Sequence, residues 1–250
     1  MEILSNSKSA VILTGAGVST GSGIPDFRSP SGVYRKYDPY RTFNVEYFKM
    51  DPDYFYSFAY HELRKMFDKK PNPTHYMIAE LERRGMIKAV ITQNIDMLHE
   101  MAGSKNVVKL HGSLEYAVCM KCEARYELRK ILMNLKVDEN GKVEVPRCEK
   151  CGGLIKPDVV FFGEPLPTFA LEKAMQLSEN ADLMITMGTS LVVYPAASLP
   201  LITHRNGGKV VIVNLGKTDL DEIAFKKYEV DLVEFSSKIL KLLEGKNECC

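Results

Sequence analysis

Apolar runs of four or five residues recur along the chain, and each is followed by a glycine, an asparagine or a polar turn. Such runs are rich in Val and Ile and predict buried strands. Amphipathic stretches with helical spacing separate most of them. Strands that alternate with helices predict an α/β fold, a Rossmann-like parallel sheet with helices on both faces. The predicted strands cover residues 10–13, 89–92, 107–110, 183–187 and 210–213, and the predicted helices cover residues 74–85, 167–178, 194–205 and 232–243.

Two stretches break this alternation and predict a second, smaller lobe. The first is rich in Tyr and Phe and contains two prolines, which indicates a loop followed by helices. The second carries four of the six cysteines and a polar turn. We therefore divide the chain into a main domain of residues 1–30, 71–115 and 157–250, a helical insertion of residues 31–70 and a cysteine-rich insertion of residues 116–156.

Charge and hydropathy exclude several classes of protein. The 33 Lys and Arg residues nearly balance the 32 Asp and Glu residues, so nothing draws the whole chain to nucleic acid or to an anionic membrane. No apolar run approaches the roughly 20 residues of a membrane span, and the polar start is unlike a secretory signal. We predict a cytoplasmic protein. Cys249 and Cys250 are interpreted as part of a solvated end, with lipid attachment as the alternative.

The other four cysteines predict a metal site. Cys119 and Cys122 form one Cys-x-x-Cys knuckle, and Cys148 and Cys151 form a second. Four thiolates suit one structural Zn²⁺ ion in a closed tetrahedron, and the paired knuckles favour this zinc ribbon over two disulfides or a redox dithiol. Zinc ribbons also bind nucleic acid. Because these knuckles lack Lys and Arg interleaved with aromatic residues, direct nucleic-acid binding is not predicted.

The first predicted strand leads into a glycine-rich loop, residues 14–28, that contains Gly15, Gly17 and Gly23. A strand followed by such a turn is how α/β proteins bring backbone N–H groups to a pyrophosphate. The spacing departs from Gly-x-Gly-x-x-Gly, because Thr20 stands where the third glycine belongs. The loop ends in Pro-Asp-Phe-Arg, where an ordinary dehydrogenase continues as helix. We expect a nucleotide to bind here for a reaction other than hydride transfer.

Polar residues also follow the other predicted strands, and ligands of such sheets bind at the carboxyl ends of the strands. Taken alone, His111 fits a core histidine that caps a strand, and Asp96 fits a helix N-cap. Together with the other strand-end residues they favour one shared crevice. Histidines 61, 75 and 204 are interpreted as structural. The strand-end sets are Gln93-Asn94-Ile95-Asp96, His111-Gly112, Gly188-Thr189-Ser190 and Asn214-Leu215-Gly216.

This ordered set of motifs resembles the sirtuins, a family of NAD-dependent protein lysine deacylases. The glycine-rich loop resembles their first motif, and the four cysteines resemble their zinc module. The likeness extends from about residue 11 to about residue 235. The terminal extensions beyond it are minimal, so the resemblance implies a compact, prokaryotic-type form of the family. The further matching motifs, in order, are Thr92-Gln93-Asn94-Ile95-Asp96, Leu110-His111-Gly112, Phe162-Gly163-Glu164, Gly188-Thr189-Ser190 and Val213-Asn214-Leu215.

The resemblance implies roles for individual residues. His111 would be the general base, with Asn94 and Asp96 completing the catalytic set. The acyl-lysine peptide would add as a strand. The residues in contact with NAD would be Gly15, Ala16, Gly17, Ser19, Ile24, Pro25, Asp26, Phe27, Arg28, Gln93, Asn94, Ile95, Asp96, His111, Gly188, Thr189, Ser190, Asn214 and Leu215. The residues in contact with the peptide would be Val159, Val160, Phe162, Gly163, Glu164, Val192 and Val193, and the zinc ligands would be the four cysteines Cys119, Cys122, Cys148 and Cys151.

The implied reaction transfers the acetyl group of an acetylated lysine to ADP-ribose and releases nicotinamide, so NAD⁺ is consumed. Relatives that prefer acidic acyl groups resemble one another in a Tyr-x-x-Arg pair, where this chain has Tyr56-Ser57-Phe58-Ala59. Without the arginine no cation pairs with a carboxylate, so we expect neutral acyl groups, acetyl first. The alternatives are mono-ADP-ribosyl transfer to protein, a non-catalytic sensor of NAD or ADP-ribose, and a dehydrogenase.

Overall fold

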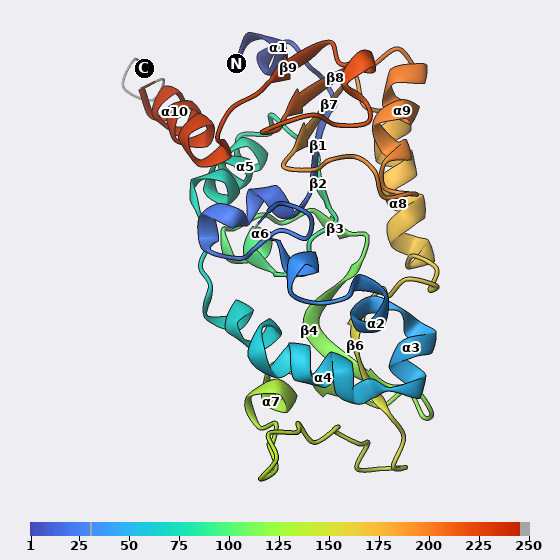
Figure 1. Cartoon of the computed structure of the whole chain (residues 1–250). Coiled ribbons are helices and arrows are strands. Elements are labelled where there is room, and N and C mark those ends of the chain that lie inside the picture. The colour runs from blue at the N-terminus through green and yellow to red at the C-terminus, as the bar shows by residue number, and fades with distance from the viewer. Residues whose placement is uncertain (31, 246–250) are drawn as a thin grey trace.

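The computed structural model describes residues 1–30 and 32–245 of the chain. Its larger lobe is built on a six-stranded parallel sheet with the order β3-β2-β1-β7-β8-β9 (Figure 1). The chain begins in the middle of the sheet, runs to one edge and returns to the middle, as in Rossmann folds. This topology confirms the predicted fold class. The strands are β1 (Ala10–Thr14), β2 (Ala89–Thr92), β3 (Val107–Lys109), β7 (Leu183–Met187), β8 (Lys209–Val213) and β9 (Lys226–Tyr228).

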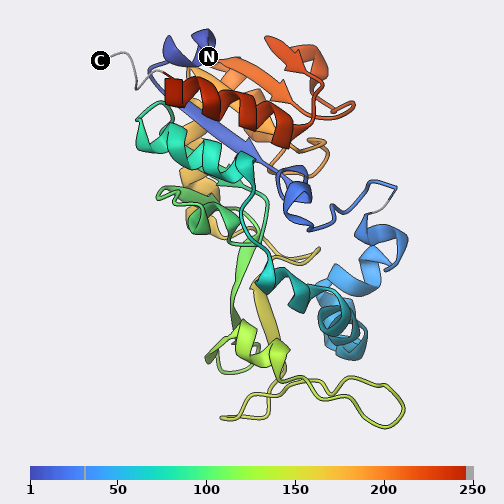
Figure 2. The same cartoon turned by 90° about the vertical axis from the view of Figure 1, so that its left-hand side faces the viewer.

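Helices cover both faces of this sheet. Figure 2 shows α5 and α10 side by side on one face, and Figure 1 shows α8 and α9 together on the other. Alternate residues of β1 explain the two layers, since Ala10 and Ile12 join the core under α5 and α10 while Val11 and Leu13 join the core under α8 and α9. All of β1 is buried, as expected for a strand covered on both faces. The helices are α1 (Glu2–Ser5), α5 (Pro73–Arg83), α6 (Leu98–Met101), α8 (Thr168–Glu179), α9 (Ser198–Arg205) and α10 (Leu232–Gly245).

The second lobe joins the two insertions in one core. Its three-stranded antiparallel sheet has the order β5-β4-β6, and the helical insertion lies beside it (Figure 1). The rings of Phe48 and Phe55 lie 5.4 and 5.2 Å from the ring of Phe161, so aromatic contacts connect the helices to the segment after β6. The elements are β4 (Gly112–Cys119), β5 (Arg125–Glu127), α7 (Leu128–Met133) and β6 (Ile155–Val159), with η3 (Val33–Arg35), α2 (Pro39–Phe43), α3 (Val45–Met50), α4 (Pro52–His61) and η4 (Leu63–Asp68) from the helical insertion.

Local sequence sets the starts of these helices. Proline occupies the first helical position of α2, α4 and α5, where its missing N–H costs nothing and its fixed φ suits a helix. The preceding Asp38 and Asn72 cap α2 and α5, and their side chains accept hydrogen bonds from the N–H groups of Arg41 and Thr74. Pro39 and Pro52, the two prolines of the helical insertion, therefore mark helix starts.

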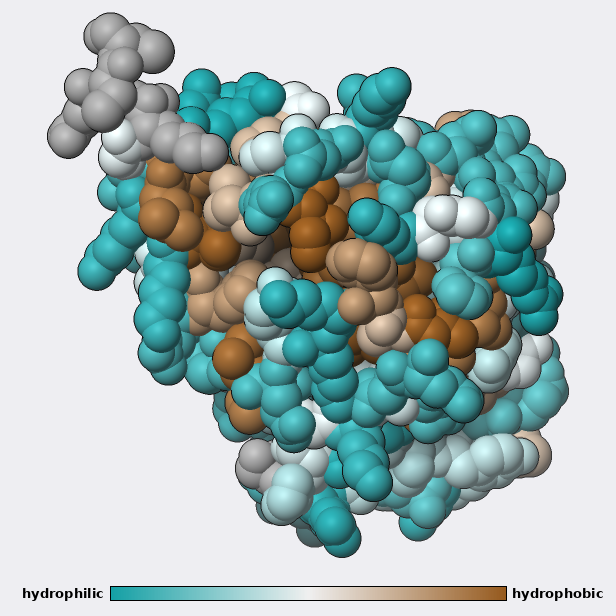
Figure 3. Space-filling view, turned by 90° about the horizontal axis from the view of Figure 1, so that it is seen from above, coloured by the Kyte–Doolittle hydropathy of each residue, from teal (hydrophilic) through white to brown (hydrophobic). Residues whose placement is uncertain are grey.

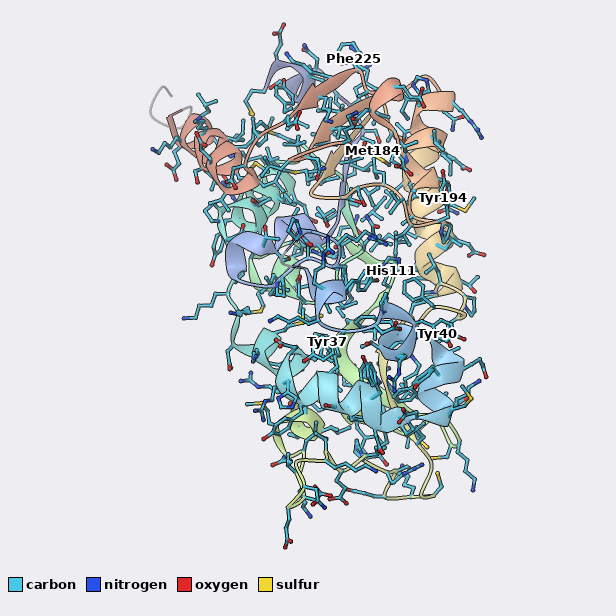
Figure 4. All side chains as sticks on the ribbon, viewed as in Figure 1. Tyr37, Tyr40, His111, Met184, Tyr194 and Phe225 are labelled. Atoms are coloured by element: carbon cyan, nitrogen blue, oxygen red, sulfur yellow. The ribbon has the colours of Figure 1, made fainter. Side chains whose placement is uncertain are left out.

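The sheet has one strand more than the sequence predicts. The sixth strand, β9, reads Lys-Lys-Tyr and pairs with β8 at the edge of the sheet. Because these residues show no apolar pattern, the sequence does not predict the strand. Lysines on an edge strand oppose pairing with another chain. The neighbouring Phe225 is 55% exposed but lies under Lys209, whose Nζ is 4.4 Å from the ring centroid. Figure 4 labels Phe225 at this end of the molecule, and Figure 3, seen from this end, shows a band of hydrophobic residues among hydrophilic ones.

Helix α9 begins at Ser198, four residues later than predicted. Tyr194 precedes Pro195, and the residue before a proline is disfavoured in the helical region, so the helix cannot begin there. The three-part division of the chain stays a prediction, and β4 and β6 run across two of its boundaries. Cys249 and Cys250 lie outside the described residues. Among residues 1–30 and 32–245, no helix combines the length and the apolar composition needed to cross a membrane.

Candidate active site between the two lobes

A cavity of about 1060 Å³ lies between the lobes, at the carboxyl ends of β1, β2, β7 and β8. Figure 4 shows His111 at the junction of the lobes. The cavity brings together every residue that the sequence places in contact with nucleotide or peptide. These are Gly15, Ala16, Gly17, Ser19, Ile24, Pro25, Asp26, Phe27, Arg28, Gln93, Asn94, Ile95, Asp96, His111, Val159, Val160, Phe162, Gly163, Glu164, Gly188, Thr189, Ser190, Val192, Val193, Asn214 and Leu215.

The glycine-rich loop lies against the loop that follows β7, at the point where the order of the strands reverses. The N–H of Gly15 donates to Met187 O at 3.0 Å, and the N–H of Gly17 donates to Gly188 O at 2.9 Å. A Cβ at Gly15 would lie 2.7 Å from Thr189 Cβ, and one at Gly17 would lie 2.7 Å from Gly188 Cα. These glycines are therefore required for the close approach of two strand-end loops. Two short 3₁₀ turns follow in place of an α-helix.

Ser19 connects the catalytic candidates Asn94 and Asp96. Its hydroxyl donates to Asp96 Oδ2 at 2.6 Å, and its oxygen accepts from Asn94 Nδ2 at 3.2 Å. The other oxygen of Asp96, Oδ1, accepts from the N–H of Leu98 at 3.0 Å, so Asp96 also caps the turn that leads into α6. Burial raises the pKa of Asp96, and the hydrogen bond from Ser19 opposes this increase. Asp96 therefore caps this turn and also lines the cavity, while its predicted catalytic role stays a prediction.

Two buried histidines stand behind this network. The N–H of Asn72 donates to His75 Nδ1 at 3.3 Å, so the proton of the neutral ring lies on Nε2, which is 3.4 Å from Ser19 Oγ. His99 lies beside it with a ring-centroid distance of 5.0 Å, and its Nε2 is 3.0 Å from Thr14 Oγ1. Burial lowers the pKa of His75 to about 4 and that of His99 to about 3. Both rings are therefore neutral near pH 7.

The sequence assigns His75 a structural role and gives His99 none. His99 follows Asp96 by three residues, and this spacing in the motif is the signal that could have placed its ring near the network. The contact with Thr14 joins residues 85 positions apart, so no local pattern predicts it.

His111 is oriented as a base by a backbone carbonyl. Its Nδ1 lies 2.9 Å from Gln93 O, and because a carbonyl oxygen only accepts, Nδ1 carries the proton. The neutral ring thus keeps a lone pair on Nε2, which has no hydrogen-bond partner within residues 1–30 and 32–245. Burial lowers the pKa of His111, and the hydrogen bond to Gln93 opposes the decrease. The backbone of His111 also accepts a hydrogen bond from the N–H of Val160 at 2.9 Å.

The aromatic residue of the glycine-rich loop, Phe27, packs toward the second lobe. The ring of Phe27 lies 5.4 Å from that of Tyr34 and 5.9 Å from that of Phe43. Asp26 stabilises the loop, because its Oδ1 accepts from the N–H groups of Arg28 and Ser29 at 3.0 and 2.8 Å. The loop is thus held to both lobes of the cavity.

The candidate acyl-specificity positions lie outside the cavity. Tyr56 is fully buried, and its hydroxyl donates to Ile155 O at 2.7 Å. Ala59 is buried as well, whereas Phe55 and Phe58 of the same helix line the cavity. The helix α4 therefore presents apolar rings to this part of the cavity.

The four cysteines of the second lobe form a site that fits zinc. Their sulfur atoms lie within 4.8 Å of one another, with Cys119 and Cys151 at 3.5 Å and Cys122 and Cys148 at 3.6 Å. A Zn²⁺ ion with Zn–S bonds of about 2.3 Å places tetrahedral sulfur ligands about 3.8 Å apart. A Cβ at Gly153 would lie 2.8 Å from Cys119 Sγ, so this glycine leaves room for the sulfur cluster.

Comparisons with known proteins are consistent with this geometry. A family model described as the Sir2 family matches residues 15–195. The chain is 50% identical over 241 residues to an NAD-dependent protein deacetylase of Thermotoga maritima, covering 96% of each chain. A solved Sir2 structure with a deacetylated p53 peptide and 3′-O-acetyl-ADP-ribose is 50% identical, has a TM-score of 0.91 and is matched over 96% of this chain and 95% of its own. Another, of Sir2 with a p53 peptide and NAD⁺, is 48% identical with a TM-score of 0.88, over 97% and 96%.

Proposed function

The chain belongs to the Sir2 family, and from this premise we propose that it is an NAD-dependent protein lysine deacetylase that transfers the acetyl group to ADP-ribose and releases nicotinamide. The observation that carries this proposal is the tautomer of His111. Gln93 O binds the proton on Nδ1, which leaves a basic Nε2 on a residue that lines the same cavity as the glycine-rich loop. A protein that only binds NAD has no need of a base held in this way.

NAD⁺ is the co-substrate and supplies the ADP-ribose that accepts the acetyl group. Its proposed binding residues are the predicted set of strand-end residues that line the cavity. The loops after β1, β7 and β8 would hold the pyrophosphate and the adenosine end, in keeping with ligand binding at the reversal point of an α/β sheet. Ser19, Asn94 and Asp96 would form a polar pocket for the nicotinamide, whose amide needs both hydrogen-bond donors and acceptors.

The residues of the site can move the required proton. With Nδ1 bonded to Gln93 O, the His111 ring accepts a proton at Nε2 and becomes a cation that the same carbonyl stabilises. The lowered pKa of His111 keeps this nitrogen unprotonated at neutral pH. We propose that the oxygen of the acetyl-lysine amide displaces nicotinamide from the ribose carbon of NAD⁺. Nε2 of His111 then accepts the proton of a neighbouring ribose hydroxyl, which attacks the acetyl carbon; the C–N bond to lysine breaks, and one water completes the products, free lysine and O-acetyl-ADP-ribose. Ser19 and Asp96 are buried, so their network would help to exclude water from the departing nicotinamide.

The zinc module has a positioning role in this proposal. Strand β4 begins next to His111 and ends at Cys119, while β6 begins four residues after Cys151 and ends at Val159. The metal would therefore fix the far ends of the two strands whose near ends carry the base and the peptide-binding segment. Its four thiolate ligands leave no open position, so the ion would take no part in the chemistry.

An acylated lysine of a protein or peptide is the proposed partner, and neutral acyl groups are the proposed substrate class. Apolar rings of α4 line the cavity, whereas the position of the expected arginine is a buried alanine. A carboxylate beside these rings would lose its hydration, and α4 offers no arginine or lysine to pair with it. We place the reaction in the cytoplasm, where the paired cysteines stay reduced and available to zinc.

Mass spectrometry of an acetyl-lysine peptide, incubated with the protein and with or without NAD⁺, tests the proposal. We expect loss of the acetyl group only with NAD⁺, together with equimolar nicotinamide and O-acetyl-ADP-ribose. ADP-ribose attached to protein without deacetylation would replace the proposal by mono-ADP-ribosyl transfer, and NAD⁺ binding without any reaction would indicate a sensor. A succinylated copy of the peptide serves as the matched substrate and should react far more slowly.

A further inference from the structure

A buried ammonium group lies at the base of the segment that follows β6. The side chain of Lys156 is only 12% exposed. Its Nζ donates to Val159 O at 2.7 Å and to Pro157 O at 3.1 Å, and it lies 3.0 Å from Glu164 Oε2. An ammonium group has three donors, so all of them are used. Burying a cation is expensive unless it is paired and fully hydrogen-bonded, and this one meets both conditions.

Glu164 closes the other side of the segment. The carboxylate oxygen that faces Lys156 also accepts from the N–H of Phe161 at 2.7 Å. The ammonium lies 4.4 Å from the ring centroid of Phe161, close enough for a cation–π contact. The chain from Pro157 to Glu164 thus folds around one charged group. We call this segment the clamped loop.

The clamped loop connects the cavity to both lobes. The N–H of Val160 donates to the carbonyl of His111, and Phe162 exchanges backbone hydrogen bonds with Phe43 and Val45 at 2.7 and 3.1 Å. Figure 1 shows β6, which leads into this loop, beside β4. The clamped loop contributes Val159 through Glu164 to the cavity wall, but Lys156 is not part of that wall.

The carboxylate of Glu164 is used within the protein, where it binds Lys156 and the backbone of Phe161. The predicted contact of Glu164 with the peptide stays a prediction and concerns its backbone. Phe162, by contrast, is 44% exposed and faces the space that a peptide would occupy. The clamped loop therefore offers a peptide its backbone and Phe162. The contacts of Lys156 and Glu164 hold that backbone in place.

We propose that Lys156 is a positioning residue which, through Glu164, holds residues 159–163 in the conformation that pairs with the acylated peptide. This inference rests on the proposed function of the cavity. Lys156 contacts none of the residues that would hold NAD, since those belong to the ends of strands in the other sheet. Loss of its ammonium group should therefore weaken peptide binding selectively.

The test compares steady-state kinetics of Lys156→Met with those of the wild type, with peptide and NAD⁺ varied separately. We expect the KM for an acetyl-lysine peptide to rise about tenfold, the factor for about 1.4 kcal/mol, because that is the cost of ordering one more residue's backbone on binding. The KM for NAD⁺ should stay within about twofold of the wild-type value, since the NAD-binding strand ends keep their contacts. Lys156→Arg, which keeps the cation, should give a smaller rise.

Lys142→Met is the matched control, because Lys142 belongs to the same lobe and pairs with Asp53 at 2.6 Å, yet 63% of its side chain is exposed. It should leave both KM values unchanged. Glu164→Gln provides a second test if Lys156→Met folds poorly. The amide oxygen of this variant can still accept from the N–H of Phe161, but the negative charge that pairs with Lys156 is lost. Thermal unfolding of each variant is measured alongside.

Binding of a fluorescent acetyl-lysine peptide, followed by anisotropy without NAD⁺, separates this inference from the proposed function. A weaker Kd in Lys156→Met and Glu164→Gln supports the inference. Equal peptide KM and Kd in these variants and the wild type overturn it, as does an equal rise in the KM for both substrates. Failure of the wild type to deacetylate any peptide overturns the proposed function instead, and the anisotropy comparison still decides the role of Lys156.

Discussion

Lowering the pH from 8 to 5 should destabilise the fold through its two buried imidazoles. Burial lowers the pKa of His75 from 6.5 to about 4 and that of His99 from 6.5 to about 3, and the neighbouring His75 adds to the decrease for His99. In the unfolded chain both rings take up a proton near pH 6.5, whereas in the folded protein they stay neutral. The unfolded state then binds more protons, so stability is complete above pH 6.5 and is lost as the pH falls below it.

The magnitude follows from the size of these pKa shifts. At pH 5 an unfolded imidazole of pKa 6.5 is almost fully protonated, and a folded one of pKa 4 or 3 is mostly neutral. The cost is about 2 kcal/mol for each histidine and about 4 kcal/mol for the pair relative to pH 8, at about 1.4 kcal/mol per pKa unit. Asp96 acts in the opposite direction, because its raised pKa favours the folded state as the pH falls. The loss is large beside a total stability of about 5–15 kcal/mol.

Urea unfolding followed by far-ultraviolet circular dichroism, at pH 8 and pH 5, measures this cost. The wild type is compared with His75→Gln, His99→Gln and the double variant, and His204→Gln, an exposed position on α9, is the control. Acid also releases zinc from cysteines, but it does so in every variant, so the difference between variants removes that contribution. We expect the pH-dependent loss to shrink by about half in each single variant and to shrink most in the double variant. A double variant that keeps the wild-type loss would refute the reasoning.

Three further changes test other parts of the structure. His111→Ala should keep NAD⁺ binding, measured by calorimetry, and abolish deacetylation; a wild-type kcat would contradict the role of the base. Cys148→Ala should lose zinc, measured with a chromogenic chelator, and lower the Tm; unchanged metal content and Tm would contradict a structural site. Gly112→Ala should lower the free energy of unfolding by about 2 kcal/mol or more, because its Cβ would lie 2.1 Å from Asp158 O at φ +75°. Gly141→Ala has a similar φ of +79° and no atom within 4 Å of the added Cβ, so a cost equal to that of Gly112→Ala would contradict the steric explanation.

The main sheet and the cavity wall could be predicted because their signals are local. A central parallel strand is buried on both faces, so β1, β2, β7 and β8 read as short apolar runs. The residues after such runs must meet at one edge of the sheet, which is why the strand-end motifs line a single cavity. The zinc cluster is predictable for a different reason, since the ion dictates the spacing of its ligands.

The features that were missed depend on partners distant in the sequence. Strand β9 is polar and pairs with β8 at the edge of the sheet. Its extended conformation comes from this pairing, so its own residues give no pattern that predicts a strand. Strands β4 and β6 are covered by aromatic rings from the helical insertion, about a hundred positions away in the case of Tyr56 and Ile155. The ammonium of Lys156 likewise binds two backbone carbonyls and a carboxylate. The sequence shows that Lys156 and Glu164 carry opposite charges, but it does not show which carbonyls lie near them.

The placement of His111 shows how these distant parts act together. Its ring is oriented by the carbonyl of Gln93, which belongs to the larger lobe, and its own carbonyl holds the N–H of Val160 in the clamped loop. The next residue, Gly112, begins β4 and pairs with Val159 of β6. A displacement of both strands would therefore move the base as well as the peptide-binding loop. The zinc site lies at the far ends of both β4 and β6, whereas the ammonium of Lys156 binds groups of β6 and the clamped loop, namely Pro157 O, Val159 O and Glu164. Loss of zinc should consequently affect kcat and peptide KM together, whereas loss of the ammonium should affect peptide KM alone.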